Sequence, residues 1–60
     1  MFCRVEILKR PRDQVICAHY KIANVVTEFD EYAERERRTH GGDGYRIENL
    51  HTGEVREAWG

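Results

Sequence analysis

The sequence predicts an α+β fold: a single-domain, two-layer ββαββ arrangement over residues 1–60, with one helix packed on a four-stranded, mostly antiparallel sheet. Three observations carry this prediction. Residues 2–8 and 14–23 alternate between apolar and polar side chains on either side of a basic, proline-containing turn. Residues 27–40 repeat apolar side chains at helical spacing. Residues 45–59 form a second alternating pair around a glycine turn.

The first predicted strand, residues 2–8, places Cys3, Val5 and Ile7 on one face. The segment 9–12 ends it, because proline has a fixed φ and no amide proton for a sheet. In the second strand, residues 14–23, the even-numbered positions form the more apolar face. A four-residue turn over 9–12 pairs Cys3 with Ala18 and unites the two faces. The predicted core face of this hairpin then consists of Cys3, Val5, Ile7, Ile16, Ala18, Tyr20 and Ile22.

The helix is predicted from Thr27 to His40. Thr27 and Asp30 resemble a capping box, with aspartate in place of the usual glutamate or glutamine. Gly41 is a natural residue to end the helix. The side chains available for burial are those at helical spacing, namely Phe29, Tyr32 and Ala33. Two acid–base pairs at i,i+4 support the helix, Glu31–Arg35 and Glu34–Arg38.

The last sixteen residues are predicted to form a hairpin with a three-residue loop, 51–53, closed by Gly53 in the left-handed region. A two-residue loop would scatter the apolar side chains over both faces, whereas the three-residue loop gathers them on one. The predicted pairs are Asn49 with Val55, Ile47 with Glu57, and Tyr45 with Trp59. We therefore expect Trp59 to be substantially buried against Tyr45 and Ile47.

The helix connects the second and third strands, so a right-handed crossover makes these two strands parallel. If the first strand lies between them, the order in the sheet is 2-1-3-4 and no parallel contact forms. We predict this order.

Composition limits the classes of function. Hydrophobic residues make up 40% and charged residues 35% of the chain, as in a folded globular domain. Residues 1–24 carry a net charge of +3 and residues 25–60 a net charge of −4, so the protein is a small dipole. This weighs against unspecific binding to nucleic acid, which needs a broad basic surface. We find no signal peptide and no membrane-spanning run, and expect a cytoplasmic protein.

Cys17 and His19 lie two residues apart and so leave the same face of the second strand. The pattern offers them no orienting group or oxyanion hole, so we expect no catalytic residue and no enzyme. The cysteines and histidines match no zinc finger, ribbon or knuckle, so we expect no metal and no cofactor. In the predicted register Cys3 and Cys17 leave opposite faces, and we expect no disulfide. An odd-numbered first turn would place Cys3 opposite His19 and open the way to a disulfide or a metal site.

The outer face of the first hairpin and its basic turn form the predicted partner surface. A single helix leaves this face uncovered, and a cluster of exposed apolar side chains suggests a partner or a dimer. The residues that we expect to contact a partner are Phe2, Arg4, Leu8, Lys9, Arg10, Arg12, Val15, Cys17 and His19. An acidic protein and a second copy of the chain are both left open as the partner.

The strand-strand-helix-strand order of residues 2–50 resembles small bacteriophage proteins that bind and disable host machinery, such as an inhibitor of bacterial RNA polymerase and some anti-CRISPR proteins. The resemblance implies a non-enzymatic protein-binding module, an inhibitor or regulator of a bacterial host complex that works in the host cytoplasm. Two alternatives remain. One is a nucleic-acid-binding accessory protein that uses the 9–12 turn, and the other is a small metal or redox protein that uses Cys17 and His19.

Overall fold

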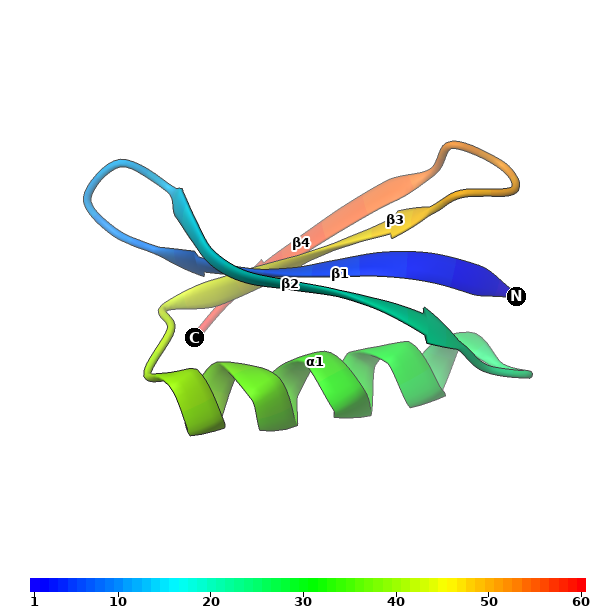
Figure 1. The fold of residues 1–60 in the computed structure, drawn as a ribbon, viewed down its shortest axis with the longest axis horizontal. Helices are drawn as coiled ribbons and strands as arrows, with labels where there is room; N and C mark the ends of the chain where they lie inside the picture. Colours follow the sequence, from blue (N-terminus) through cyan, green and yellow to red (C-terminus); the bar gives the residue numbers. More distant parts are fainter.

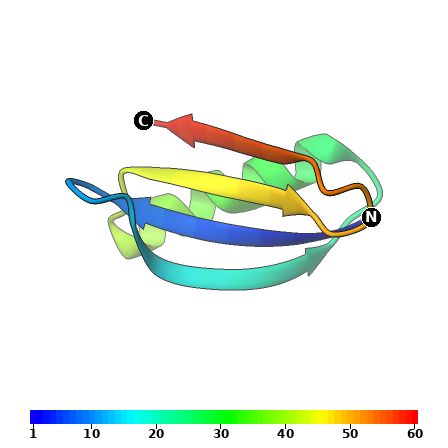
Figure 2. The same cartoon turned by 90° about the horizontal axis from the view of Figure 1, so that it is seen from above.

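The computed structural model describes all of residues 1–60 and contains four strands and one helix. These are β1 (Phe2–Lys9), β2 (Gln14–Ile22), α1 (Val26–His40), β3 (Gly44–Asn49) and β4 (Val55–Trp59). The helix covers one face of the sheet, and no element covers the other (Figures 1 and 2). The predicted two-layer α+β fold is confirmed. The helix is neither long nor apolar enough to cross a membrane.

The strand order is β2-β1-β3-β4, as predicted, with β1 between the two strands that the helix connects. Each neighbouring pair is antiparallel, so the sheet is antiparallel throughout. The central position of β1 explains why its inward side chains are fully buried, while β2 and β4 are edge strands.

The core lies between α1 and the two central strands. The buried residues that pack together are Cys3, Val5, Ile7, Ala23, Phe29, Ala33 and Ile47. Phe29 and Ala33 are buried as the helical spacing predicts, and Tyr32 packs partly buried against them. Tyr45 also contacts this core from β3.

The predicted register of the first hairpin is wrong. Cys3 pairs with Lys21 instead of Ala18, and a β-bulge near Ile16 shifts the pairing between Ile7 and Leu8. The turn consists of residues 10–13, because Lys9 pairs with Gln14. Cys17 and His19 therefore face the helix. The predicted core residues of β2 are exposed or on the outer face, namely Ile16, Ala18, Tyr20 and Ile22.

The position of β2 at the edge of the sheet explains why its apolar side chains are exposed. The helix lies chiefly over β1 and β3 and makes few contacts with β2. The apolar side chains of β2 consequently gain little by facing the helix, and burial does not fix their register.

The two cysteines are free, as predicted, but for another reason. They share a face and are separated along the sheet, since Cys17 pairs with Ile7, four residues from Cys3 on β1.

The predicted register of the second hairpin is also wrong, by one residue. Tyr45 pairs with Ala58 and Ile47 pairs with Arg56, so the loop has four residues, 50–53. Gly53 has the predicted left-handed conformation, with a φ of 80°. The side chain of Asn49 accepts hydrogen bonds from the backbone of His51 and Thr52, at 2.8 and 3.2 Å. This Asn49 turn ends β3 and lengthens the loop, which the alternating pattern does not reveal.

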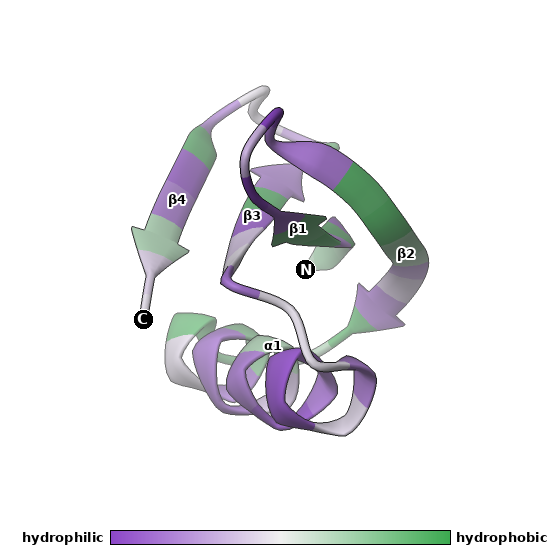
Figure 3. Ribbon diagram, turned by 90° about the vertical axis from the view of Figure 1, so that its left-hand side faces the viewer, coloured by the Kyte–Doolittle hydropathy of each residue, from purple (hydrophilic) through white to green (hydrophobic).

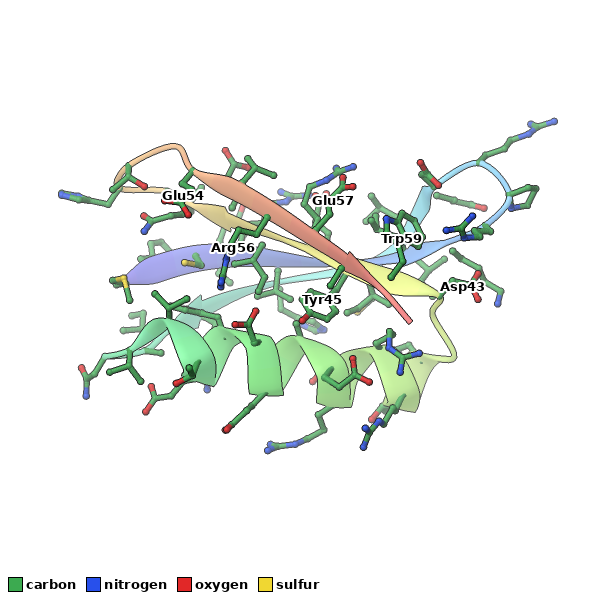
Figure 4. The ribbon with its side chains drawn as sticks, turned by 180° about the vertical axis from the view of Figure 1, so that it is seen from behind. Asp43, Tyr45, Glu54, Arg56, Glu57 and Trp59 are labelled. Atoms are coloured by element: carbon green, nitrogen blue, oxygen red, sulfur yellow. The ribbon has the colours of Figure 1, made fainter.

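The shift places Trp59 on the face of the sheet opposite to Tyr45. Figure 4 shows Tyr45 and Arg56 directed toward the helix, and Glu57 and Trp59 on the far side. The expected burial of Trp59 against Tyr45 and Ile47 is therefore wrong. Trp59 is partly buried and lies across Gly44, its partner in the sheet.

The helix begins at Val26, one residue earlier than predicted, and the Thr27–Asp30 capping box does not form. Val25 occupies the cap position without a side-chain hydrogen bond. The carboxylate of Glu28 instead accepts a hydrogen bond from the backbone amide of Asn24, at 3.1 Å. Gly41 ends the helix in the left-handed region, as predicted. Of the two predicted acid–base pairs, Glu34–Arg38 forms at 3.3 Å, and Glu31–Arg35 is not among the ion pairs.

We expect Trp59→Ala to lower the free energy of unfolding by roughly 2 kcal/mol, about half the usual cost of truncating a fully buried aromatic side chain. The reason is that the indole is only partly buried, against Gly44 and under the guanidinium of Arg10, 4.7 Å from the ring. Urea denaturation measures the change. A loss as large as that of a central core residue would contradict this placement of Trp59.

Candidate functional site

The outer face of the sheet is the uncovered layer of the molecule, and its centre is a chain of ion pairs. Glu6 contacts Arg4 at 3.3 Å and Arg46 at 3.1 Å, and Arg46 contacts Glu57 at 2.9 Å. The hydrogen bond to Glu57 raises the pKa of Arg46, with Glu6 adding to the effect. Because these four charges satisfy one another, the chain of ion pairs itself has no unpaired charge to offer an ionic ligand.

At one end of the outer face lies an exposed apolar patch formed by Phe2, Tyr20 and Ile22. Tyr20 is 59% exposed and Ile22 is 74% exposed. The rings of Phe2 and Tyr20 are 5.6 Å apart, and Phe2 pairs with Ile22 across the sheet. A shallow depression adjoins the patch, lined by Met1, Phe2, Ile22, Asn49, His51 and Thr52. Several contacting apolar side chains left in water are a common mark of a partner surface.

At the other end of the outer face, the basic segment 9–12 is held by contacts with residues that follow the helix and with the end of β4. Lys9 donates a hydrogen bond to the carbonyl of Gly41 at 3.1 Å. The backbone amide of Arg10 donates to Asp43 at 2.8 Å, and its guanidinium stacks on Trp59. These contacts engage Lys9 and Arg10 and leave Arg12 as the free cation of residues 9–12. The turn is thus a poor phosphate-binding loop, which weighs against the nucleic-acid alternative.

The strand β2 has one free edge, and the pairing with β1 identifies the backbone groups on it. Met1 and Ala23 exchange two hydrogen bonds, of 3.0 and 2.7 Å. In an antiparallel ladder such pairs alternate with pairs whose N–H and C=O groups point away from each other. The residues of β2 with outward-pointing backbone groups are therefore Ala18, Tyr20 and Ile22, whose side chains also lie on the outer face.

The two edges of the sheet differ in their protection. Edge strands are usually made short or highly charged, because a free edge can pair with another chain. β4 fits this rule, with five residues that include Arg56 and Glu57. β2 has nine residues with Lys21 as the one charge, and its hydrophobic stretch is visible in Figure 3. The free edge of β2 is therefore the less protected one.

The structure brings together only some of the residues predicted to contact a partner. Phe2, Arg4 and Val15 lie on the outer face as expected. The expectation that Leu8 is accessible is wrong, because it is fully buried. The outward placement predicted for Cys17 and His19 is wrong as well, since both face the helix. Sequence reasoning missed Tyr20 and Ile22, because it assigned them to the core on their apolar character.

No family model, curated protein or solved structure matches this chain. The fold and the site therefore define only a class: a small α+β domain with a bare sheet face and an unprotected edge strand.

Proposed function

We propose that the protein is a non-enzymatic protein-binding module that takes up an extended segment of a partner along the free edge of β2. The observation that carries the proposal is the coincidence of outward backbone groups and the exposed apolar patch on the same residues, Tyr20 and Ile22. An added strand would form hydrogen bonds to these groups, each contributing about 0.5–1.5 kcal/mol. The patch would accept alternate side chains of the added segment and provide specificity.

The charges near this edge favour a partner segment that carries acidic residues. Arg4 lies beside Tyr20 on the outer face and donates a hydrogen bond to its hydroxyl at 3.3 Å. Lys21 is the charge of β2 itself. Arg4 is already paired with Glu6, whereas Lys21 forms no ion pair and would speed encounter with an acidic protein segment.

The role that fits such a module is that of an inhibitor or regulator that occupies a surface of a larger complex in the cytoplasm. A bacterial host complex, targeted by a protein of bacteriophage type, is the setting that the sequence resemblance implies. The support is the small size of the domain, its antiparallel ββαββ order and its one unprotected edge.

The test begins with a peptide-display selection against the immobilised protein, followed by amide hydrogen exchange of the complex. We expect binding to protect the amides of Ala18, Tyr20 and Ile22, and to leave the outward amides of β4 unchanged. Ala18→Pro removes one outward N–H, a position where an edge strand tolerates proline. We expect it to weaken binding about tenfold or more, which corresponds to about 1.4 kcal/mol.

Val55→Pro is the matched control, because Val55 has the equivalent outward position on the edge of β4. It should leave affinity unchanged. Selected peptides that bind Ala18→Pro and the unmodified protein equally well would show that the β2 edge is not the docking element. Salt-dependent retention on nucleic acid that Arg12→Ala abolishes would favour the nucleic-acid alternative instead.

A further inference from the structure

Four side chains with metal-binding atoms meet at the other face of β2, where it approaches the end of the helix. Cys17 and His19 leave β2 on the helix side, two residues apart. Glu36 and His40 lie one turn apart on α1 and face β2. Each element thus contributes two ligand atoms, and the spacing on each is the one that places both on the same face.

The four ligand atoms form a closed ring of short contacts. The Sγ atom of Cys17 lies 2.9 Å from Nε2 of His19 and 3.6 Å from Nε2 of His40. The Oε2 atom of Glu36 lies 2.9 Å from Nε2 of His40 and 3.7 Å from Nε2 of His19. Across the ring, the ligand atoms of Cys17, His19 and His40 are all within 4.8 Å of one another.

Four of the six distances between these ligand atoms are close to those in a tetrahedral zinc site. With bonds of about 2.0–2.1 Å to nitrogen and about 2.3 Å to sulfur, neighbouring ligand atoms are about 3.3–3.6 Å apart. The four contacts, between 2.9 and 3.7 Å, bracket this range. An ion midway between two imidazole nitrogens that are at most 4.8 Å apart is within about 2.4 Å of each, so small side-chain movements suffice to bring Cys17, His19 and His40 onto one ion. Glu36 lies outside this group of three, and its carboxylate must move toward Cys17 to complete the tetrahedron.

The chemistry of the donors favours Zn²⁺ over other common divalent ions. One thiolate, two neutral imidazoles and one carboxylate give a charge of −2, which neutralises the ion. Sulfur and nitrogen ligands suit zinc, whereas Mg²⁺ and Ca²⁺ take oxygen ligands. The other cysteine, Cys3, is not available, because it is 3% exposed in the core and burial raises its pKa.

A supporting residue stands behind the four ligands. The ring of Tyr32 meets that of His19 edge-on, with centroids 6.3 Å apart. This contact restricts the orientation of the His19 imidazole.

From this geometry we propose that Cys17, His19, Glu36 and His40 bind one Zn²⁺ ion that fastens the edge strand β2 to the last turns of α1. Four protein ligands fill a tetrahedral site, so the ion has a structural role and no open position for a substrate. An ion here would add to a weak contact, because the helix packs mainly on β1 and β3 and makes few contacts with β2. The inference is independent of the partner surface, which lies on the opposite face and the free edge of β2.

The experiment is a titration of the reduced, metal-free full chain with Co²⁺ and then Zn²⁺. We expect one Co²⁺ per chain, the strong visible absorption of tetrahedral Co²⁺, a thiolate-to-cobalt band in the near ultraviolet, and displacement of both by Zn²⁺. Cys17→Ser and His40→Gln should each weaken Zn²⁺ binding by at least about 100-fold, the upper end of what loss of an outer partner costs. Zn²⁺ should raise the Tm of the wild-type protein and leave the Tm of both variants unchanged.

His51→Gln is the matched control, because this histidine is exposed in the loop between β3 and β4, outside the cluster. Far-ultraviolet circular dichroism of the metal-free variants verifies that they fold. No tetrahedral absorption, several weakly bound ions per chain, or an equal loss of affinity in His51→Gln would overturn the proposal. An unchanged affinity in Glu36→Gln would overturn the four-ligand, structural assignment.

Discussion

Phe29→Ala is expected to destabilise the protein by about 3–5 kcal/mol, the usual cost of truncating a buried aromatic side chain. Phe29 is 1% exposed and is the largest fully buried side chain, held between the helix and the central strands. A chain of this length has a total stability of roughly 3–9 kcal/mol. The substitution should therefore lower the Tm by between about 12 and 40 °C, or leave the chain unfolded at room temperature.

Thermal and urea denaturation without added metal measure this effect. Glu31→Ala, an exposed position on the same helix, is the control and should change stability by less than about 0.5 kcal/mol. If Phe29→Ala unfolds at the same urea concentration as the wild type, the helix does not pack on the sheet as described.

Leu8→Asp is expected to have an effect of similar size, at a position that the sequence assigns to the partner surface. Leu8 is fully buried, yet it lies outside the main core cluster. It is in register with Gly44, across which Trp59 lies. The substitution removes a buried aliphatic group, which costs about 2–5 kcal/mol, and adds the cost of burying an unpaired carboxylate. We expect a chain that is unfolded at neutral pH.

Far-ultraviolet circular dichroism and urea denaturation distinguish this outcome from a loss of binding alone. Ile22→Asp is the matched variant, because Ile22 is 74% exposed in the apolar patch. It should fold with nearly unchanged stability and lose affinity for a peptide bound at the β2 edge. A well-folded Leu8→Asp protein would mean that Leu8 belongs to the surface after all.

Much of the fold could be predicted from the sequence, because patterns within short segments determine which strands and helices form. Alternation in residues 2–8, helical spacing around Phe29 and Ala33, and Gly41 and Gly53 at the ends of elements are properties of short segments. They predicted the five elements and the class of fold. The predicted strand order depended on placing the first strand between the second and the third, and the structure confirms it.

The sequence did not predict the registers of the two hairpins. Because the register decides which face each side chain occupies, the candidate sites were missed as well. A bulge near Ile16 and the Asn49 turn each move a strand by one residue, which reverses the face of every side chain that follows. On an edge strand that the helix barely covers, burial does not penalise exposed apolar groups. Tyr20 and Ile22 thus face solvent, although their hydrophobicity predicts a core.

The sequence by itself determined which elements this protein forms and that Cys17 and His19 share a face. Only the tertiary structure decided that this face meets Glu36 and His40 and that Leu8 is buried. The physical reason is that burial and ligand geometry depend on which elements lie side by side. Contacts between residues about twenty positions apart in the chain depend on registers that no local pattern records.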